Sequence, residues 1–449
     1  MLAVRAPAPA EYRRRTPERE PLYQALAGHL ETFLAQHRAQ EQPLPRHIEQ
    51  ELRAYLECGI LAYGFVRLRC TACGGSRLIA FSCKRRGFCP SCLGRRMADI
   101  AAHLVDHVLP HAPVRQWVLS LPYELRYRLA WDRALLGAVL AVFLRLVAGW
   151  YRAQARRQGH PAGRTGAVTF VQRFGSSLNL NPHLHVLMPD GVWVSGPDTV
   201  PTFVAAHPPT EGDIQHLVER TAQRLVRLLQ RRGLLDQDRT DPLAQDQPLL
   251  AALTAAAVQG TVATGPRAGQ RLRRRLADPA DGQRTAPLCY AARGFSLHAA
   301  TRVPAHDRTR LEHLCRYVLR PPLAAARLRW LDPDTLSLTL KTPWADGTTH
   351  LLLSPHELLE KLAALVPPPR QHLIRYHGVL APHAADRGQI VPAPADPAAT
   401  PSAAPTELAR PWRQSWACLL ARVFRQDLTL CPACGGPMRL IAAPTDPDP

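Results

Sequence analysis

Apolar residues recur at intervals of three and four along several stretches of the chain, a pattern typical of amphipathic helices. Leu22 and Leu26 begin the first such stretch. Asp132 precedes a long apolar stretch and is a suitable N-cap for it, because an aspartate side chain accepts hydrogen bonds from the first helical N–H groups. The pattern predicts helices over 21–57, 97–110, 133–157, 210–235 and 307–319, and a further helix that ends near residue 365.

Shorter apolar runs lie between these helices and predict strands. Asp190-Gly191 separates two of the runs, and this dipeptide is typical of a tight hairpin turn. The last two runs also predict a hairpin. The predicted strands cover 117–121, 168–174, 183–188, 192–194, 336–340 and 350–353, so the chain combines helices and strands.

The chain has 449 residues, too many for one compact core, and we expect two or three domains. A stretch rich in alanine and proline is typical of a linker. The predicted order is a loose N-terminus (1–20), a helical and metal-binding domain (21–112), a central domain (113–380), the linker (381–411) and a C-terminal cysteine-bearing segment (412–449).

The net charge is +20, and only three of the 56 basic residues are lysines. Such an excess of positive charge predicts a polyanionic partner, either nucleic acid or an anionic membrane surface. Codon usage in a GC-rich genome explains the preference for arginine but not the net charge. Residues 261–285 carry six arginines and predict either a basic loop or hairpin near DNA or merely a solvated charged loop.

Membrane insertion is not expected. Residues 1–15 contain no apolar signal core, and the longest apolar run, 134–144, is stopped by Arg145. That run is too short to cross a bilayer and predicts a buried helix. Eleven cysteines without an export signal indicate metal ligation in a reducing compartment rather than disulfides.

Two Cys-x-x-Cys pairs predict a structural zinc site. Cys70 and Cys73 form the first pair, Cys89 and Cys92 form the second, and fifteen residues separate the pairs. This is the spacing of a four-thiolate zinc site, in which each turn directs two sulfurs at one ion. Cys83, inside the loop, is either a substitute ligand or a small buried residue. Cys58 is open to both interpretations as well.

Basic residues surround these pairs and predict contact with phosphate, although many zinc ribbons bind protein instead. A third pair, Cys431 and Cys434, lies near the end of the chain, and Cys418 is a candidate third ligand for it. This pair either binds a second zinc ion or forms a knuckle-like turn without metal. The candidate phosphate contacts near the first two pairs are Arg85, Arg86, Arg95 and Arg96.

A histidine pair is the main sign of catalysis. His183 and His185 lie two residues apart in a predicted strand, so their side chains project from the same face. Two imidazoles and a third polar group can hold a metal ion that polarises a phosphate oxygen. The His-x-His pattern alone also arises by chance in many chains.

Tyr317 is the candidate nucleophile among ten tyrosines, because it lies on a predicted helix between Arg316 and Arg320, which could hold phosphate. A phenolate suits reversible strand transfer, since it is a stable leaving group. A core tyrosine on an amphipathic helix explains the same pattern.

Five blocks, in order over about residues 20 to 440, together resemble transposases of the rolling-circle "ninety-one" family of insertion sequences. This family belongs to the HUH nucleases, named for a histidine-hydrophobe-histidine motif. Residues 81–92 resemble the family's N-terminal zinc domain, 166–186 its histidine core and 316–322 its tyrosine motif. Residues 375–382 and 431–436 resemble its downstream blocks.

The resemblance implies an α+β fold, with an antiparallel-sheet HUH core flanked by helices and an N-terminal zinc ribbon. It implies that Tyr317 attacks single-stranded DNA at an element end, forms a 5′-phosphotyrosine and frees a 3′-OH. His183 and His185 would bind Mg²⁺ or Mn²⁺, and Gln172 is a candidate third ligand. Some members have a second tyrosine four residues earlier, where this chain has His313.

Two other functions stay open: a non-catalytic, zinc-dependent DNA-binding protein, and an HUH replication initiator or relaxase. A three-carboxylate transposase is disfavoured because no acidic trio stands in a comparable context. The expected location is the bacterial cytoplasm, in association with the nucleoid. The sequence leaves open the DNA end, the target site and the oligomeric state.

Overall fold

The computed structural model describes residues 15–196, 200–235, 240–276, 287–392 and 428–444. Helices and strands are intermixed along the chain, and all named strand pairs are antiparallel, so the expected α+β class is confirmed. The helices are α1 (Pro21–Ala39), α2 (Arg46–Glu57), α3 (Pro90–His107), α4 (Tyr123–Trp131), α5 (Arg133–Arg157), α6 (Glu211–Arg231), α7 (Pro242–Asp246), α8 (Pro248–Gln259), α9 (Arg308–Leu319), α10 (Pro355–Leu365) and α11 (Arg387–Ile390).

The strands form four sheets, of which the largest has the order β15-β4-β5-β3-β10-β9, with β11 also beside β3. The strands are β1 (Phe65–Cys70), β2 (Ser76–Ala80), β3 (Val114–Ser120), β4 (Gly166–Phe174), β5 (Leu180–Pro189), β6 (Gly191–Val194), β7 (Thr202–Ala205), β8 (Arg273–Leu276), β9 (Cys289–Ala292), β10 (Phe295–His298), β11 (Arg302–Val303), β12 (Leu328–Asp332), β13 (Thr335–Thr339), β14 (Thr348–Leu353), β15 (Ile374–Gly378) and β16 (Met438–Ala442).

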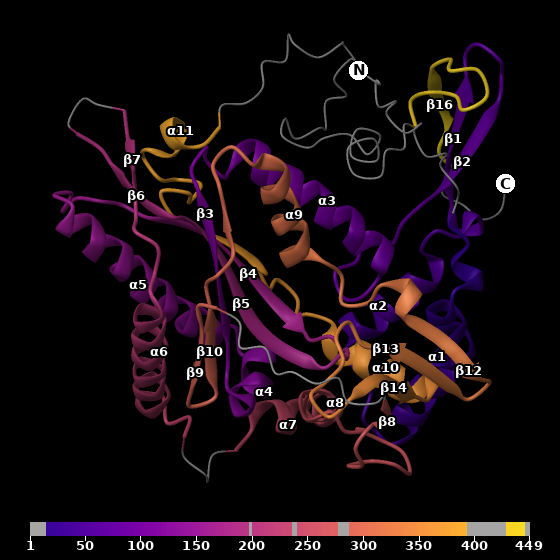
Figure 1. The fold of residues 1–449 in the computed structure, drawn as a ribbon. Coiled ribbons are helices and arrows are strands. Elements are labelled where there is room, and N and C mark those ends of the chain that lie inside the picture. Colours follow the sequence, from indigo (N-terminus) through magenta and orange to yellow (C-terminus); the bar gives the residue numbers. More distant parts are fainter. Residues whose placement is uncertain (1–14, 197–199, 236–239, 277–286, 393–427, 445–449) are drawn as a thin grey trace.

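Helices cover both faces of this central sheet (Figure 1). On one face, α5 and α6 pack on Trp117 of β3 and Val186 of β5. On the other face, α3 and α9 pack on Phe170 of β4 and Leu187 of β5. Because each central strand is covered on both faces, its apolar residues are buried on both sides of the sheet.

The long apolar helix α5 begins where the sequence predicts. The carboxylate of Asp132 accepts a hydrogen bond from the N–H of Leu135, as an N-cap does. By length and composition α5 could cross a membrane, but residues along it, Phe143 and Tyr151 among them, lie in the core against the sheet. It is therefore placed as the buried helix that the sequence predicts.

The helix predicted over 21–57 is two helices, because Pro45 stands between α1 and α2 and serves as the N-cap of the second. The helix predicted from residue 97 begins earlier, at Pro90. A proline suits the first turn of a helix, where its missing N–H is not needed. This early start brings the second cysteine pair to the N-terminus of α3.

The hairpin predicted at Asp190-Gly191 is wrong. The chain turns there, but β5 pairs with β3 and β4, whereas β6 pairs with β7 in a separate two-stranded sheet. Both edges of β5 are already taken. The second predicted hairpin, β13 and β14, is present.

A second core lies beside the central sheet. The sheet β12-β13-β14-β8 packs against α1, α2, α8 and α10 through side chains such as Phe33, Leu52 and Leu351. Strand β8, in the arginine-rich stretch, pairs with β14 and carries exposed arginines. The basic stretch is thus a strand in part, and its residues 277–286 lie outside the described residues.

The third sheet joins the two ends of the described chain. The C-terminal strand β16 pairs with β1, and β1 pairs with β2, so the order is β16-β1-β2 (Figure 1). Residues 438–444 thus lie against residues 65–70. The predicted N-terminal ribbon includes a strand from the far end of the chain.

Candidate functional site

The two histidines lie side by side on strand β5. Their ring centroids are 4.9 Å apart. Leu184 and Val186, which alternate with them along the strand, face the opposite side and are fully buried against α5 and α6. The alternation of the strand therefore explains why both imidazoles face α9.

Tyr317 of α9 lies on the same face of the sheet. Its ring centroid is 6.2 Å from that of His185, in an edge-to-face arrangement. Leu314 and Val318 are buried in the core between α9, α3 and the sheet, and they fix the orientation of the helix. Tyr317 itself is 44% exposed. Three residues selected from the sequence are thus neighbours, and the tyrosine is accessible from outside.

Two positive charges flank the Tyr317 ring. The guanidinium carbon of Arg320 is 4.5 Å and the ammonium of Lys341 is 4.7 Å from the ring centroid. Burial would raise the pKa of the Tyr317 phenol, but a hydrogen bond from Arg320 and the charges of Arg320 and Lys341 lower that pKa below its usual value. Lys341 stands in no recognisable motif, and its one unusual feature in the sequence is that it is one of only three lysines.

Arg316, the other arginine expected to hold phosphate, forms an ion pair with Glu312 one turn earlier on α9. Glu312 therefore partly neutralises the positive charge of Arg316. Arg320 lies beyond the end of the helix and next to Tyr317, so it is the better placed of the two.

Each imidazole makes a hydrogen bond through its Nδ1 atom. Nδ1 of His183 lies 2.7 Å from the carbonyl oxygen of Asn181, so this nitrogen donates its proton and Nε2 carries the lone pair. Nδ1 of His185 accepts a hydrogen bond from the side-chain amide nitrogen of Gln116 at 2.8 Å, and its Nε2 is buried with no hydrogen-bond partner among the described residues. Burial, with the nearby His183 and Arg320, lowers the pKa of His185 to about 3, which keeps it neutral.

Gln172 lies on β4 directly opposite His183 in the strand register. Its side-chain nitrogen donates to the carbonyl of Val318 at 3.3 Å, which leaves its Oε1 buried with no partner among the described residues. The side-chain oxygen of Asn181 is buried without a partner in the same way. Nε2 of His183 and two amide oxygens are thus available as ligands, and Nε2 of His185 joins them when the Gln116 amide is rotated by 180°. Asn181, two residues before His183, could have been found by extending the strand alternation.

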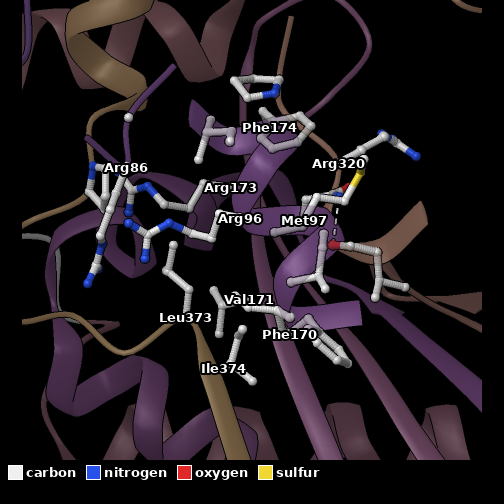
Figure 2. Close-up of a pocket in the computed structure, with 18 of the residues that line it drawn as sticks. Arg86, Arg96, Met97, Phe170, Val171, Arg173, Phe174, Arg320, Leu373 and Ile374 are labelled. Carbon is white, nitrogen blue, oxygen red and sulfur yellow. Dashed lines mark hydrogen bonds between the residues drawn. The ribbon is translucent and has the colours of Figure 1, made fainter. Parts of the chain in front are cut away.

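A cavity of ≈ 120 Å³ opens beside this site, between α3, β4 and the end of α9. Gln172 and Arg320 line both the cavity and the histidine–tyrosine site. Most of its wall is apolar. Figure 2 shows three arginines gathered on one side of it and Arg320 on the other. Other lining residues are Arg86, Arg96, Met97, Phe170, Arg173 and Phe174.

Among the arginines expected to contact phosphate, Arg86 and Arg96 line the cavity, whereas Arg85 and Arg95 do not. Arg86 donates to the carbonyl of Gln371 at 2.6 Å, which ties its side chain to the central domain. Arg96 is exposed on α3. The N-terminal part of the chain therefore contributes two basic side chains to the wall of this cavity.

The cysteines form two clusters in the described part of the chain. Within each cluster, the four sulfurs lie within 4.8 Å of one another. None of the eight forms a disulfide, and neighbouring sulfurs lie 3.3 to 3.7 Å apart. Four sulfurs at 2.3 Å from a tetrahedral zinc ion would be about 3.8 Å apart. The clusters are Cys58, Cys83, Cys89 and Cys92, and Cys70, Cys73, Cys431 and Cys434.

This arrangement corrects the expected grouping of Cys70 and Cys73 with Cys89 and Cys92 in one site. The first pair lies at the tip of the β1–β2 hairpin, and the second lies at the start of α3. The spacing of the motifs predicts that each pair shares an ion, but the tertiary fold decides which pairs meet. Cys83 is a cluster member, not an isolated buried residue. Cys418 lies outside the described residues.

Two protein-family models match the chain. Residues 26–121 match the model described as "Transposase zinc-binding domain", which is named for IS91, the insertion sequence ninety-one. Residues 166–387, which carry the histidine pair and Tyr317, match the model described as "Putative transposase". No curated protein and no solved structure matches the chain. With its zinc-binding domain and the transposase region in the order expected from the sequence, the chain belongs to the IS91 family of transposases.

Proposed function

We propose that this transposase cleaves and rejoins single-stranded DNA at the ends of an insertion sequence, with Tyr317 as the nucleophile. The observation that carries the proposal is the placement of Tyr317 next to His185, on the sheet face that also carries His183. Membership of a transposase family makes DNA the partner of the protein. The reaction and the form of the DNA are the parts proposed here.

In the proposed step, the phenol oxygen of Tyr317 gives up its proton and attacks the scissile phosphorus. The bond from phosphorus to the 3′-oxygen breaks, and that oxygen takes up a proton to become a free 3′-OH. The downstream strand stays on the enzyme, joined to Tyr317 through its 5′ phosphate as a phosphotyrosine. Attack by another 3′-OH reverses the step and joins the strands. Arg320 and Lys341 stabilise the phenolate before the attack and the phosphate charge during it.

His183, His185 and Gln172 would hold a divalent cation, Mg²⁺ or Mn²⁺. Nε2 of His183 and the unpaired Oε1 of Gln172 fit this function, since each presents a lone pair. The neutral His185 fits it once the Gln116 amide is rotated so that its oxygen accepts from Nδ1–H. When bound, such an ion adds positive charge at the phosphate and orients it. Asn181 is a further candidate oxygen ligand.

The cavity beside Tyr317 favours single-stranded DNA as substrate. Its apolar wall, which includes Phe170 and Phe174, suits a nucleobase, and its arginines suit the phosphates on either side. A base enters such a recess only when it is not stacked in a duplex. Arg86 and Arg96 would then make the zinc-bearing domain part of the DNA-binding surface. The bacterial cytoplasm, where the chromosome lies, is the corresponding location.

The test is a covalent trap. Purified protein is incubated with Mn²⁺ and 5′- and 3′-labelled single-stranded oligonucleotides that tile both element ends, and adducts are resolved on a denaturing gel. We expect an adduct with the wild-type protein and none with Tyr317→Phe. The matched control is Tyr123→Phe, because Tyr123 is equally exposed, at 43% against 44%.

An adduct that persists in Tyr317→Phe would show that another residue is the nucleophile. If the wild-type protein binds the oligonucleotides but forms no adduct with any of them, the protein is a DNA-binding member without cleavage activity. That result would favour the non-catalytic alternative over both the transposase reaction and the initiator or relaxase reaction.

A further inference from the structure

We propose that this transposase holds a second structural zinc ion, bound by cysteines from opposite ends of the chain, which fastens the C-terminal knuckle to the N-terminal hairpin. Cys431 and Cys434 lie outside both matched family regions, 26–121 and 166–387, so neither match accounts for this site. We name it the terminal cluster, made of Cys70, Cys73, Cys431 and Cys434.

The two halves of the terminal cluster have the same sequence motif and the same backbone turn. Both read Cys-x-x-Cys-Gly-Gly, beginning at Cys70 and at Cys431. In each, the N–H of the first cysteine donates to the carbonyl of the sixth residue at 2.8 Å. The N–H of the fifth residue donates back to the carbonyl of the first, at 3.1 Å in one and 2.8 Å in the other. The fifth residues, Gly74 and Gly435, have φ of 74° and 70°, a conformation that favours glycine.

Such a turn directs two sulfurs to one side of the backbone, and the two turns face each other. Cys70 Sγ lies 3.5 Å from Cys434 Sγ, and Cys73 Sγ lies 3.7 Å from Cys431 Sγ. These separations suit four thiolates around one tetrahedral ion and are far longer than a disulfide bond. Four sulfurs gathered from two matched turns therefore make a complete zinc site.

Burial alone holds the C-terminal strand weakly. Leu440 and Ile441 of β16 are 61% and 49% exposed, so this strand buries little apolar surface against β1. Backbone pairing with β1, and the bond from the N–H of Thr71 to the carbonyl of Pro437 at 3.0 Å, set the register. A pair of short strands with an open face is marginal in water without further stabilisation. Metal ligation supplies that stabilisation, because zinc binding becomes folding free energy.

The other cluster differs in its surroundings. Cys58, Cys89 and Cys92 are buried in the apolar core with α1 and α2, and all its members fall within the matched zinc-binding domain. In the terminal cluster, by contrast, Cys73 and Cys434 are exposed. A chelator should therefore remove the ion of the terminal cluster first.

The first test counts zinc in the full-length protein by elemental analysis. We expect two ions per chain in the wild-type protein, one in Cys70→Ser/Cys73→Ser, and one in Cys431→Ser/Cys434→Ser. Combining all four substitutions should still leave one ion, because both pairs hold the same one. The control Cys289→Ser, at an exposed cysteine outside both clusters, should keep two. Two ions in either double variant, or none in the quadruple variant, would overturn the proposal.

The second test asks whether the ion holds the chain ends together. A protease site is inserted after Ala404, and the cleaved, purified protein is run on a sizing column without denaturant. We expect the C-terminal fragment to co-elute with the remainder, and to separate after a chelator is added or in the Cys431→Ser/Cys434→Ser variant. Cys83→Ser should leave the fragment attached. A fragment that stays bound after complete zinc removal, or leaves the wild-type protein with both ions present, contradicts the proposal.

Discussion

The side-chain amide of Gln116 on β3 lies 2.8 Å from Nδ1 of His185 on the neighbouring strand β5. Both groups are buried, so the hydrogen bond fixes the ring orientation and determines which nitrogen carries the proton. As the side chains stand, the Gln116 amide N–H donates to Nδ1 and the ring proton lies on Nε2. Rotation of this amide by 180° lets its oxygen accept from Nδ1–H and gives Nε2 a lone pair for the metal. Gln116 is in this sense a positioning residue, one step removed from the proposed metal.

We therefore predict that Gln116→Leu weakens the binding of Mn²⁺ by about 10- to 100-fold, the usual effect of removing such a partner. The measurement is the Mn²⁺ concentration that gives half-maximal adduct formation, together with direct Mn²⁺ binding by calorimetry. Affinity for the oligonucleotide without metal should not change. Unaltered Mn²⁺ dependence in a folded Gln116→Leu protein would mean that this hydrogen bond does not orient His185.

Lys341 should set the pH at which Tyr317 reacts. Its charge, with Arg320, lowers the pKa of the phenol, so Lys341→Met should raise that pKa. The phenolate is the reactive form, and below its pKa the fraction present falls tenfold per pH unit. The rate of adduct formation in Lys341→Met should therefore increase at a higher pH than it does in the wild-type protein.

The measurement is the pH–rate profile of single-turnover cleavage. Arg220→Met serves as the control, because it removes one exposed positive charge from α6, on the opposite face of the sheet. A rate that drops equally at all pH values in Lys341→Met would assign Lys341 to phosphate binding alone.

Filling the cavity beside Tyr317 should weaken the binding of single strands selectively. Met97 lines the cavity, and Met97→Trp would occupy the space proposed for a base. Because base–aromatic stacking contributes about 1–3 kcal/mol, affinity for single-stranded oligonucleotide should fall about 5- to 150-fold. Leu331→Trp, at an exposed position on β12, adds the same ring elsewhere. Equal loss for single-stranded and duplex DNA would argue against a base in this cavity.

Asp190 should be critical for stability. This buried carboxylate accepts hydrogen bonds at 2.9 Å from Arg115, from Arg302 and from the Tyr151 hydroxyl. Its removal would leave Arg115, also buried, as an unpaired charge, so Asp190→Ala should lower the free energy of unfolding by about 3–5 kcal/mol.

Urea denaturation monitored by tryptophan fluorescence measures this effect. The exposed pair Arg274–Asp346, at 3.0 Å, offers the comparison, and Asp346→Ala should lower the free energy of unfolding far less than Asp190→Ala, because solvent screens an exposed ion pair. Similar losses in both variants would show that the Asp190 network is not the stronger of the two.

Local signals in the sequence predicted local structure well. Asp132 caps α5, and the alternation of β5 places both histidines on one face. These features depend on residues a few positions apart, where backbone geometry leaves few choices. Asp190-Gly191 does mark a turn, but its hairpin is absent because both neighbours of β5 come from elsewhere in the chain.

Long-range partners could not be predicted in this way. Gln116 and Lys341 carry no motif, and they acquire their proposed functions only because β3 and the segment after β13 lie next to the site. The Cys-x-x-Cys motifs predicted zinc ligation but not which cysteine pairs share one ion. No spacing rule connects Cys73 to Cys431, since their contact depends on β16 lying beside β1.

The pairing of β1 with β16 also has a consequence during protein synthesis. A chain leaves the ribosome from its N-terminus, and domains fold as they emerge. Strand β1 is made early, yet its second neighbour, β16, follows more than 360 residues later in the chain. A polypeptide released too soon would expose an unpaired strand edge, which favours aggregation. Only chains translated through β16 would therefore complete this three-stranded sheet.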